Sequence, residues 1–331
     1  MAKRICLMLL TLLIAGCVAV EENANPHNQT VKPKHSATQS ELQLYQGAWD
    51  DSVQSAADIS TSTKAALQAD QALARGDKNK AAAFYARAIE LDKKNVNAGY
   101  KLAVLHEDAG NYGQAEQLYR YLLKQSPRHT GILEGLGLIL LEQNNLKEAR
   151  RLLVKSVAIF ETQNTRENNL QNHIPIKAFN GLGLIADRNG DYQQAQAYYR
   201  QGLSLNPDSA SMMNNLAYSY FLAGDWKKAK ALLYQVLQIQ PHYPRAVYNL
   251  ALVNVRDRRF NKAVELLEQF MEPYEASNDV GYLAMMVGDN VAAAELFQQA
   301  IDLAPSYYET AWKNMDKLKQ LSGISKTEIK Q

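Results

Sequence analysis

Few residues in this 331-residue sequence are of the types that carry out chemistry, and their spacing does not match a catalytic or metal site. The six histidines are scattered. His106-Glu107 begins like the zinc-protease pattern HExxH, but Gly110 stands where the second histidine is required. The Gly-Leu-Gly segments 135–137 and 181–183 lack the third glycine of a dinucleotide loop. We therefore predict a protein that is not an enzyme and has no metal site, cofactor or small-molecule substrate.

The two cysteines, Cys6 and Cys17, both lie in an apolar N-terminal stretch. Lys3 and Arg4 precede apolar residues 5–15, the order found in a secretory signal peptide. The uncharged run 5–20 has sixteen residues, fewer than the roughly 18–20 that a transmembrane helix needs. A removable signal peptide, residues 1–16, is therefore favoured over a membrane-spanning helix.

The segment Ile14-Ala15-Gly16-Cys17 resembles the bacterial lipobox. The resemblance implies a lipoprotein in which Cys17 carries S-diacylglycerol and N-acyl chains such as palmitate. The alternatives are an ordinary signal peptide that contains a cysteine, or a short buried helix. Val18 stands where an aspartate would favour the inner membrane. In a Gram-negative cell we expect a lipid anchor on the periplasmic face of the outer membrane.

Charge and cysteine content argue against nucleic-acid binding and against a disulfide within the chain. Removal of residues 1–16 takes away Lys3 and Arg4, which lowers the formal net charge from +2 to zero. A neutral chain without a block of basic residues gives no sign of nucleic-acid binding. With one cysteine left, no disulfide can form within the chain.

The remaining residues divide by composition into a tether and a helical body. Residues 17–37 are polar, contain Pro26 and Pro33, and are predicted to be a disordered tether. A leading helix is expected over 38–60, where Thr38 and Glu41 form a capping box. Residues 61–320 are predicted to form a repeat array, followed by a tail at 321–331.

One pattern recurs seven times in the array: a turn, an alanine five residues after it, and an aromatic or aliphatic residue four residues later. The intervals between turns are 34, 34, 46, 34, 34 and 30 residues, and the turns fall at Gly76, Gly110, Asn144, Gly190, Gly224, Arg258 and Gly288. This period and pattern resemble the tetratricopeptide repeat (TPR), a pair of helices called A and B. We predict an all-α fold, a TPR superhelical solenoid of about seven repeats with a C-terminal capping helix around Tyr308, Trp312, Met315 and Leu318.

Two intervals depart from the period. The 46-residue interval contains an insertion at 164–175, expected to be a longer helix end and a polar loop. The 30-residue interval lacks about one helical turn, which we place around 271–278.

A TPR array curves, and positions 2, 5, 9, 12 and 13 of each helix A line its concave face. In repeats five and six these positions give an apolar strip flanked by asparagine and arginine. The predicted partner-binding residues are Tyr218, Phe221, Tyr248, Leu252, Val255, Asn180, Asn214, Arg245 and Arg256. A protein partner is expected there, as a helix or an extended segment. The alternative is that these side chains pack between helices.

The C-terminal half, with NNLAYSYFLAGDWKKAKALL and APSYYETAWKNMDKL, resembles the TadD family of tight-adherence (Flp) pilus assembly lipoproteins. The resemblance implies a pilotin-like adaptor that helps an outer-membrane secretin or another pilus-assembly component. Two other classes stay open. One is a scaffold for cell-envelope or peptidoglycan enzymes, and the other is a purely structural stabiliser of a complex, because a fold does not determine its function.

Overall fold

The structure is a computed structural model that describes residues 59–164 and 173–322. The predicted signal peptide, Cys17, the tether, the tail, most of the insertion and nearly all of the leading helix lie outside the described residues. Within the described ranges, none of the helices combines the length and the apolar composition needed to span a bilayer.

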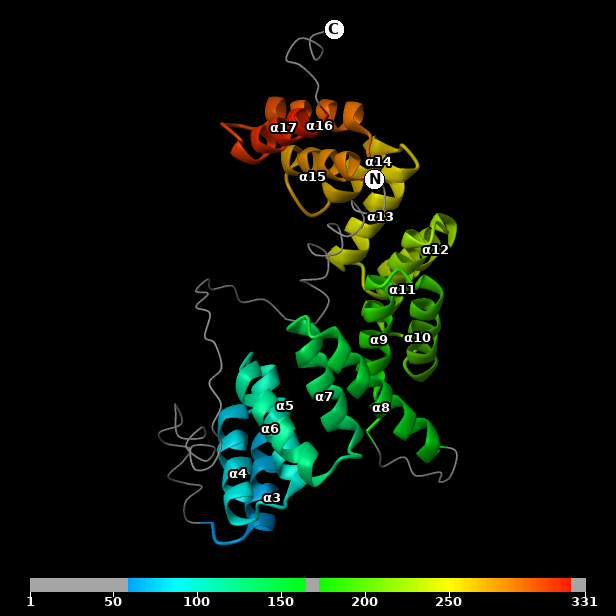
Figure 1. Cartoon of the computed structure of the whole chain (residues 1–331). Helices are drawn as coiled ribbons and strands as arrows, with labels where there is room; N and C mark the ends of the chain where they lie inside the picture. The colour runs from blue at the N-terminus through cyan, green and yellow to red at the C-terminus, as the bar shows by residue number, and fades with distance from the viewer. Residues whose placement is uncertain (1–58, 165–172, 323–331) are drawn as a thin grey trace. The chain divides into compact units, whose positions relative to one another are not determined.

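The described residues fold into fifteen helices and no strands, which confirms the all-α prediction. Fourteen of the helices are seven successive A and B pairs, and the last stands alone (Figure 1). The pairs are α3 Ser62–Ala74 and α4 Lys78–Leu91, α5 Val96–Asp108 and α6 Tyr112–Gln125, α7 Thr130–Glu142 and α8 Leu146–Asn164, α9 Ile176–Arg188 and α10 Tyr192–Leu205, α11 Ala210–Leu222 and α12 Trp226–Ile239, α13 Pro244–Arg256 and α14 Phe260–Leu267, α15 Pro273–Met286 and α16 Asn290–Leu303, followed by α17 Glu309–Ser322.

The seven predicted turns all have a left-handed backbone. Each turn residue has a φ between 58° and 87°, and the described residues with positive φ are these seven: Gly76, Gly110, Asn144, Gly190, Gly224, Arg258 and Gly288. Left-handed φ ends a helix by turning the chain out of the right-handed path, which glycine tolerates best. Asn144 and Arg258 adopt the same left-handed conformation although each has a Cβ, which makes a positive φ less favourable than it is for glycine.

The aspartate after the turn glycine begins helix B. Asp77, Asp191, Asp225 and Asp289 each precede a B helix, and each side chain accepts a hydrogen bond from the backbone N–H three residues later. This is the geometry of an N-cap. The Gly-Asp dipeptide therefore ends one helix and starts the next.

The alanines of the repeat pattern, and the aromatic or aliphatic residues four positions after them, which we call fillers, are fully or almost fully buried. The seven alanines have no exposed surface, and the seven fillers expose 1% or less of theirs: Ala81, Ala115, Ala149, Ala195, Ala229, Ala263 and Ala293, with Tyr85, Tyr119, Leu153, Tyr199, Leu233, Leu267 and Phe297. Glycines on neighbouring A helices leave room for some of these fillers. A Cβ at Gly183, for example, would lie 2.3 Å from the Tyr199 ring.

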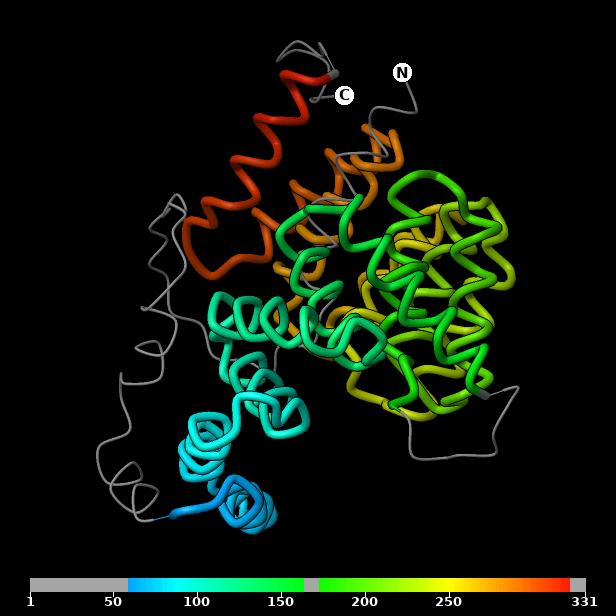
Figure 2. The backbone as a smooth tube through the Cα atoms, turned by 60° about the horizontal axis from the view of Figure 1, so that its bottom comes forward, coloured from blue at the N-terminus to red at the C-terminus, as the bar shows by residue number. Residues whose placement is uncertain are grey.

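The chain divides into two compact units, and the division falls inside α9, between residues 182 and 183. Within each unit, helices that follow one another in sequence are neighbours in space (Figure 2). In the unit that contains 183–322, one apolar cluster lies around Leu233 and Leu250 and a second around Val280 and Phe297. Met315 and Leu318 of α17 belong to the second cluster, so this helix covers the last repeat as predicted.

The two irregular intervals have different structural causes. Helix α8 has 19 residues and ends at Asn164, so the 46-residue interval does begin with a longer helix end. Helix α14 has eight residues, against 14 in α12 and α16. The short interval therefore removes turns from the end of a B helix. Our placement around 271–278 was wrong, because residues 273–278 form the start of α15.

The turn glycines give a matched test of backbone conformation. Gly110 has φ +77°, whereas Gly113 lies inside α6, and an added Cβ would meet nothing within 4 Å at either position. We expect Gly110→Ala to lower the free energy of unfolding by about 1–2 kcal/mol and Gly113→Ala to raise it by about 0.5–1 kcal/mol. Thermal unfolding followed by circular dichroism measures both. Equal effects of the two changes would contradict the conformational explanation.

Candidate partner-binding face

The predicted partner-binding residues lie on the A helices. Asn214, Tyr218 and Phe221 are on α11, whereas Arg245, Tyr248, Leu252, Val255 and Arg256 are on α13, all within the unit that contains 183–322. Asn180 is on the part of α9 that belongs to the other unit. We call the side chains at these positions of the A helices the A-helix face.

Two aromatic rings on α11 lie one helical turn apart. The Tyr218 and Phe221 rings are stacked, with 6.1 Å between their centroids and 15° between their planes. Both side chains are half-buried. Residues three apart on a helix share one face, so these rings form a continuous aromatic surface.

A third ring lies on the next A helix and is held by a carboxylate. The hydroxyl of half-buried Tyr248 donates a hydrogen bond to Asp279 Oδ2 of α15 at 2.5 Å. Burial, followed by the nearby carboxylates of Asp279 and Glu275, raises the pKa of the Tyr248 hydroxyl. Close by, the Tyr274 and Tyr308 rings meet edge to face with centroids 5.0 Å apart. These acidic and aromatic residues were not among the predicted ones, although the same five positions of helix A in repeat seven include Glu275 and Tyr282.

Three of the predicted residues are used inside the protein. Leu252 and Val255 expose only 3% and 1% of their surface, and Val255 packs in an apolar cluster with Val247. Asn214 is 3% exposed, and its Oδ1 accepts a hydrogen bond from Asn249 Nδ2 at 2.9 Å. The exposed strip is therefore narrower than predicted. Its apolar part consists of the Tyr218, Phe221 and Tyr248 rings.

The two flanking arginines differ in position. Arg245 is half-buried at the start of α13, whereas Arg256 is exposed at its end. The Arg256 guanidinium lies 4.8 Å from the centre of the Trp226 ring, a cation–π contact. Arg256 therefore contacts the turn between α11 and α12.

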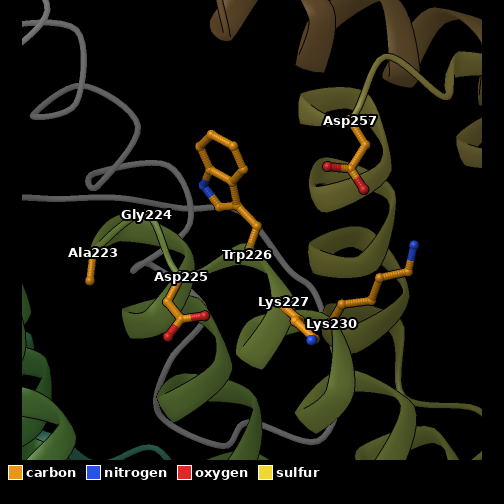
Figure 3. A pocket seen from close by; sticks show the side chains of 7 residues that line it. All are labelled: Ala223, Gly224, Asp225, Trp226, Lys227, Lys230 and Asp257. Atoms are coloured by element: carbon orange, nitrogen blue, oxygen red, sulfur yellow. The ribbon is translucent and has the colours of Figure 1, made fainter.

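That turn borders an open recess of about 590 Å³ (Figure 3). Ala223 and Gly224 form one side, and Trp226, Lys227, Lys230, Asp225 and Asp257 supply the side chains around it. Lys230 Nζ is 3.4 Å from Asn254 Oδ1. The recess combines one large aromatic ring with charged groups.

A buried aspartate joins helices from two consecutive repeats. Asp187 on α9 is 6% exposed and accepts hydrogen bonds from Tyr199 Oη on α10 at 2.9 Å and Ser219 Oγ on α11 at 2.6 Å. Burial raises the pKa of the Asp187 carboxyl to about 7, although the two hydrogen bonds oppose this. The repeat pattern placed Asp187 at a face position, but its side chain connects helices.

The unit that contains 59–182 has its own polar cluster on the A helices. Buried Glu134 of α7 accepts the Ala178 backbone N–H at 2.8 Å and lies 2.5 Å from His173 Nε2. Pro175 directly precedes α9 and has no side-chain oxygen, so Glu134 takes the role of an N-cap from another helix. Thr130 Oγ1 also donates to the His173 carbonyl at 3.1 Å. These contacts hold the end of the predicted insertion against α7.

A half-buried carboxylate lies close to this cluster. Glu107 of α5 accepts a hydrogen bond from Tyr119 Oη at 3.0 Å, and Lys177 Nζ is 3.9 Å from its other oxygen. Burial raises the pKa of the Glu107 carboxyl, which Lys177 partly offsets. No group of three or more metal-binding side chains occurs within residues 59–164 and 173–322.

Comparison with known proteins agrees with the class that this fold defines. One family model of the tetratricopeptide repeat matches residues 100–163 and 180–244, and a second model of the same repeat matches residues 220–274. A tetratricopeptide repeat protein from Parabacteroides merdae has the same fold, with a TM-score of 0.52 and 15% identity over 78% of this chain and 98% of that one. The protein is an all-α TPR array, a fold that generally serves as a scaffold for protein–protein interaction.

Two curated relatives match parts of the chain. Type IV pilus assembly protein PilF from Pseudomonas aeruginosa is 27% identical over 146 residues, which cover 44% of this chain and 54% of PilF. Human protein O-mannosyl-transferase TMTC3 is 25% identical over 147 residues, which cover 43% of this chain and 14% of TMTC3. The chain thus spans about half the length of one relative and a small part of the other.

Asp187 predicts a pH dependence of stability. Its pKa in the folded protein, about 7, is above its ordinary value of 3.8. The stabilisation is therefore fully present below pH 3.8 and is lost as the pH rises to about 7. Relative to Asp187→Asn, the wild type should lose about 1.4 kcal/mol of unfolding free energy per pH unit between about pH 4 and 7.

Urea unfolding of both proteins across this pH range measures the difference. Exposed Asp208, changed to Asn, is the control and should leave the pH profile unchanged. Parallel profiles for the wild type and Asp187→Asn would show that Asp187 is ionised in the folded protein throughout.

Proposed function

We propose that the chain is a lipid-anchored TPR adaptor, pilotin-like in role, that supports assembly of a pilus or secretion machine of the Flp/Tad type by binding a protein partner. The observation that carries this proposal is the stacked pair of Tyr218 and Phe221 rings on α11, with the half-buried Tyr248 ring at the corresponding face of the next A helix, α13. The similarity to PilF, a type IV pilus assembly protein, favours a pilus over other machines.

The three rings suit a partner that inserts apolar side chains. Tyrosine and phenylalanine supply large contact areas with few rotatable bonds, so ordering them costs little entropy. Their half-buried state means that their orientation is already set by neighbouring helices. Arg245 and Asp279 at the border of the rings provide charges of both signs, which would orient a bound helix or extended segment.

The anchor would act by confining this face to the membrane surface. Acyl chains on Cys17 hold firmly when two or three are present, because each buried CH₂ contributes about 0.8 kcal/mol. Confinement raises the effective concentration of the face near a membrane-bound client. An outer-membrane secretin or another pilus-assembly component is the client that fits this role.

The Tyr248–Asp279 hydrogen bond also favours the second candidate, a purely structural stabiliser. In that case the hydroxyl fixes α13 to α15, and the ring has no partner to contact. The two functions differ in what each atom of Tyr248 does, so substitutions that separate hydroxyl from ring distinguish them.

We expect Tyr218→Ala combined with Tyr248→Ala to abolish surface pili in the source bacterium, because both aromatic anchors are lost. Loss of one anchor of about 2 kcal/mol weakens binding about 30-fold. Tyr218→Phe with Tyr248→Phe keeps the rings and should retain pili. Surface pilin, protein level and thermal unfolding are measured for each variant.

Three outcomes would count against the adaptor. Pili that persist in the double alanine variant would exclude this face. A double alanine variant that loses its fold would assign the rings to packing. Loss of pili in Tyr248→Phe alone would assign Tyr248 to the structural function, because only the hydroxyl is missing there.

The anchor has a matched control within the signal peptide. Cys17→Ser should leave a protein that is uncleaved or released from the membrane, and its mass should lack the diacylglycerol. Cys6→Ser should behave like wild type, because Cys6 lies inside the segment that is removed. Unchanged fractionation and mass for Cys17→Ser would overturn the lipoprotein assignment.

A further inference from the structure

Charge is distributed very unevenly over the last three repeats. Residues 225–262 contain only two acidic residues, Asp225 and Asp257, against eight basic ones: Lys227, Lys228, Lys230, Arg245, Arg256, Arg258, Arg259 and Lys262. Residues 263–312 contain no Lys, Arg or His but nine acidic residues: Glu265, Glu268, Glu272, Glu275, Asp279, Asp289, Glu295, Asp302 and Glu309. The net charge of the whole chain is only +2, so this separation is a local property of the fold.

Seven of the eight basic residues lie at the edge of repeats five and six where the A–B turns are, whereas Arg245 is at the other end of α13. The contact between Arg256 and the Trp226 ring, 4.8 Å from its centre, places these two turns side by side. The recess of about 590 Å³ opens at this basic edge, with Trp226, Lys227 and Lys230 around it (Figure 3). Lys227 is exposed and Trp226 half-buried, so an ammonium group and an aromatic ring are both accessible at the recess.

An acidic knob lies at the opposite end of α14. Glu265 and Glu268 are exposed there, and the adjacent Phe270 is 39% exposed, with its ring perpendicular to that of His242 and the two centroids 5.8 Å apart. The knob is thus an aromatic side chain flanked by two glutamates. The recess also has an aromatic ring, and its charged lining consists of Lys227 and Lys230 together with Asp225 and Asp257. Asp225 is already paired with Lys228 at 2.7 Å, so the two lysines of the recess are the complement of the two glutamates of the knob.

The knob cannot fill the recess of its own chain. Helix α14 starts beside the basic edge, directly after Arg258 and Arg259, and runs eight residues to Leu267. At 1.5 Å per residue this separates the two surfaces by about 12 Å along the helix axis. The recess, lined by residues of repeats five and six, and the knob, which belongs to repeat six, therefore lie at opposite edges of these repeats.

We infer that the recess takes the acidic knob of a second copy of this chain. Phe270 of one copy packs beside Trp226 of the other, and Glu265 and Glu268 pair with Lys227 and Lys230. The contact joins two different surfaces, so a pair of copies keeps one free recess and one free knob, and the copies associate head to tail. The inference goes beyond the proposed function, because neither Cys17 nor the aromatic strip takes part.

Sedimentation velocity of the purified full chain tests the contact, in mild detergent that keeps the apolar N-terminal run from associating by itself. We expect association at about 50 mM salt that is lost at about 500 mM, because salt screens charges on exposed surfaces. Lys227→Glu with Lys230→Glu should weaken self-association at least about tenfold, and Glu265→Lys with Glu268→Lys should do the same.

Mixing these two variants is the decisive step. Each reversed surface then meets a complementary one on the other variant, so association should return in the mixture alone. The control is Lys124→Glu with Lys155→Glu, which changes the net charge by the same amount at exposed positions in the other unit. The control should associate like wild type.

Four results would overturn the inference: a monomer at both salt concentrations, association that ignores both reversals, equal loss in the control, or no recovery on mixing. A monomer that instead sediments with anionic phospholipid vesicles through Lys227 and Lys230 would show that the basic edge faces a membrane. Pilus assembly is not measured here, so failure of this test leaves the proposed function standing.

Discussion

Close approach of paired helices is the constraint on which the rest of the structure depends. A single helix pair cannot bury its apolar side, and it becomes stable only when stacked on its neighbours. The seven repeat alanines, all without exposed surface, let helices A and B come close enough for the aromatic and leucine fillers to close the gaps. A larger side chain at one of them would separate a pair of helices and disturb the repeats on both sides.

Stacking also forces polar side chains of the A helices into the interior, and the protein uses them to join helices. Asp187 connects three helices through two hydroxyl groups, and Glu134 caps a helix whose own first residues cannot. Each buried carboxylate needs such partners, because an unsatisfied one costs several kcal/mol. These contacts leave fewer A-helix side chains available for a partner than a repeat pattern implies.

The surface that remains divides into regions of different chemistry. The A-helix face offers three half-buried aromatic rings, one of which, Tyr248, is bonded to Asp279. By contrast, the edge at the A–B turns is basic and the end of α14 is acidic. A partner protein and a second copy of the chain would therefore meet different surfaces and need not compete. Separation of this kind suits an adaptor that holds several components together.

The sequence by itself determined the number of repeats, the seven turns and the buried alanines and fillers. Those features depend on backbone conformation and helical periodicity within about thirty residues. Residues close together in the sequence are enough to specify both. Only the tertiary structure decided which face residues remain exposed. Asn214 bonds Asn249, Tyr248 bonds Asp279 and Asp187 bonds Ser219, each across 31 to 35 residues. Such pairs depend on how one repeat is rotated against the next, because that rotation sets which side chains can reach each other.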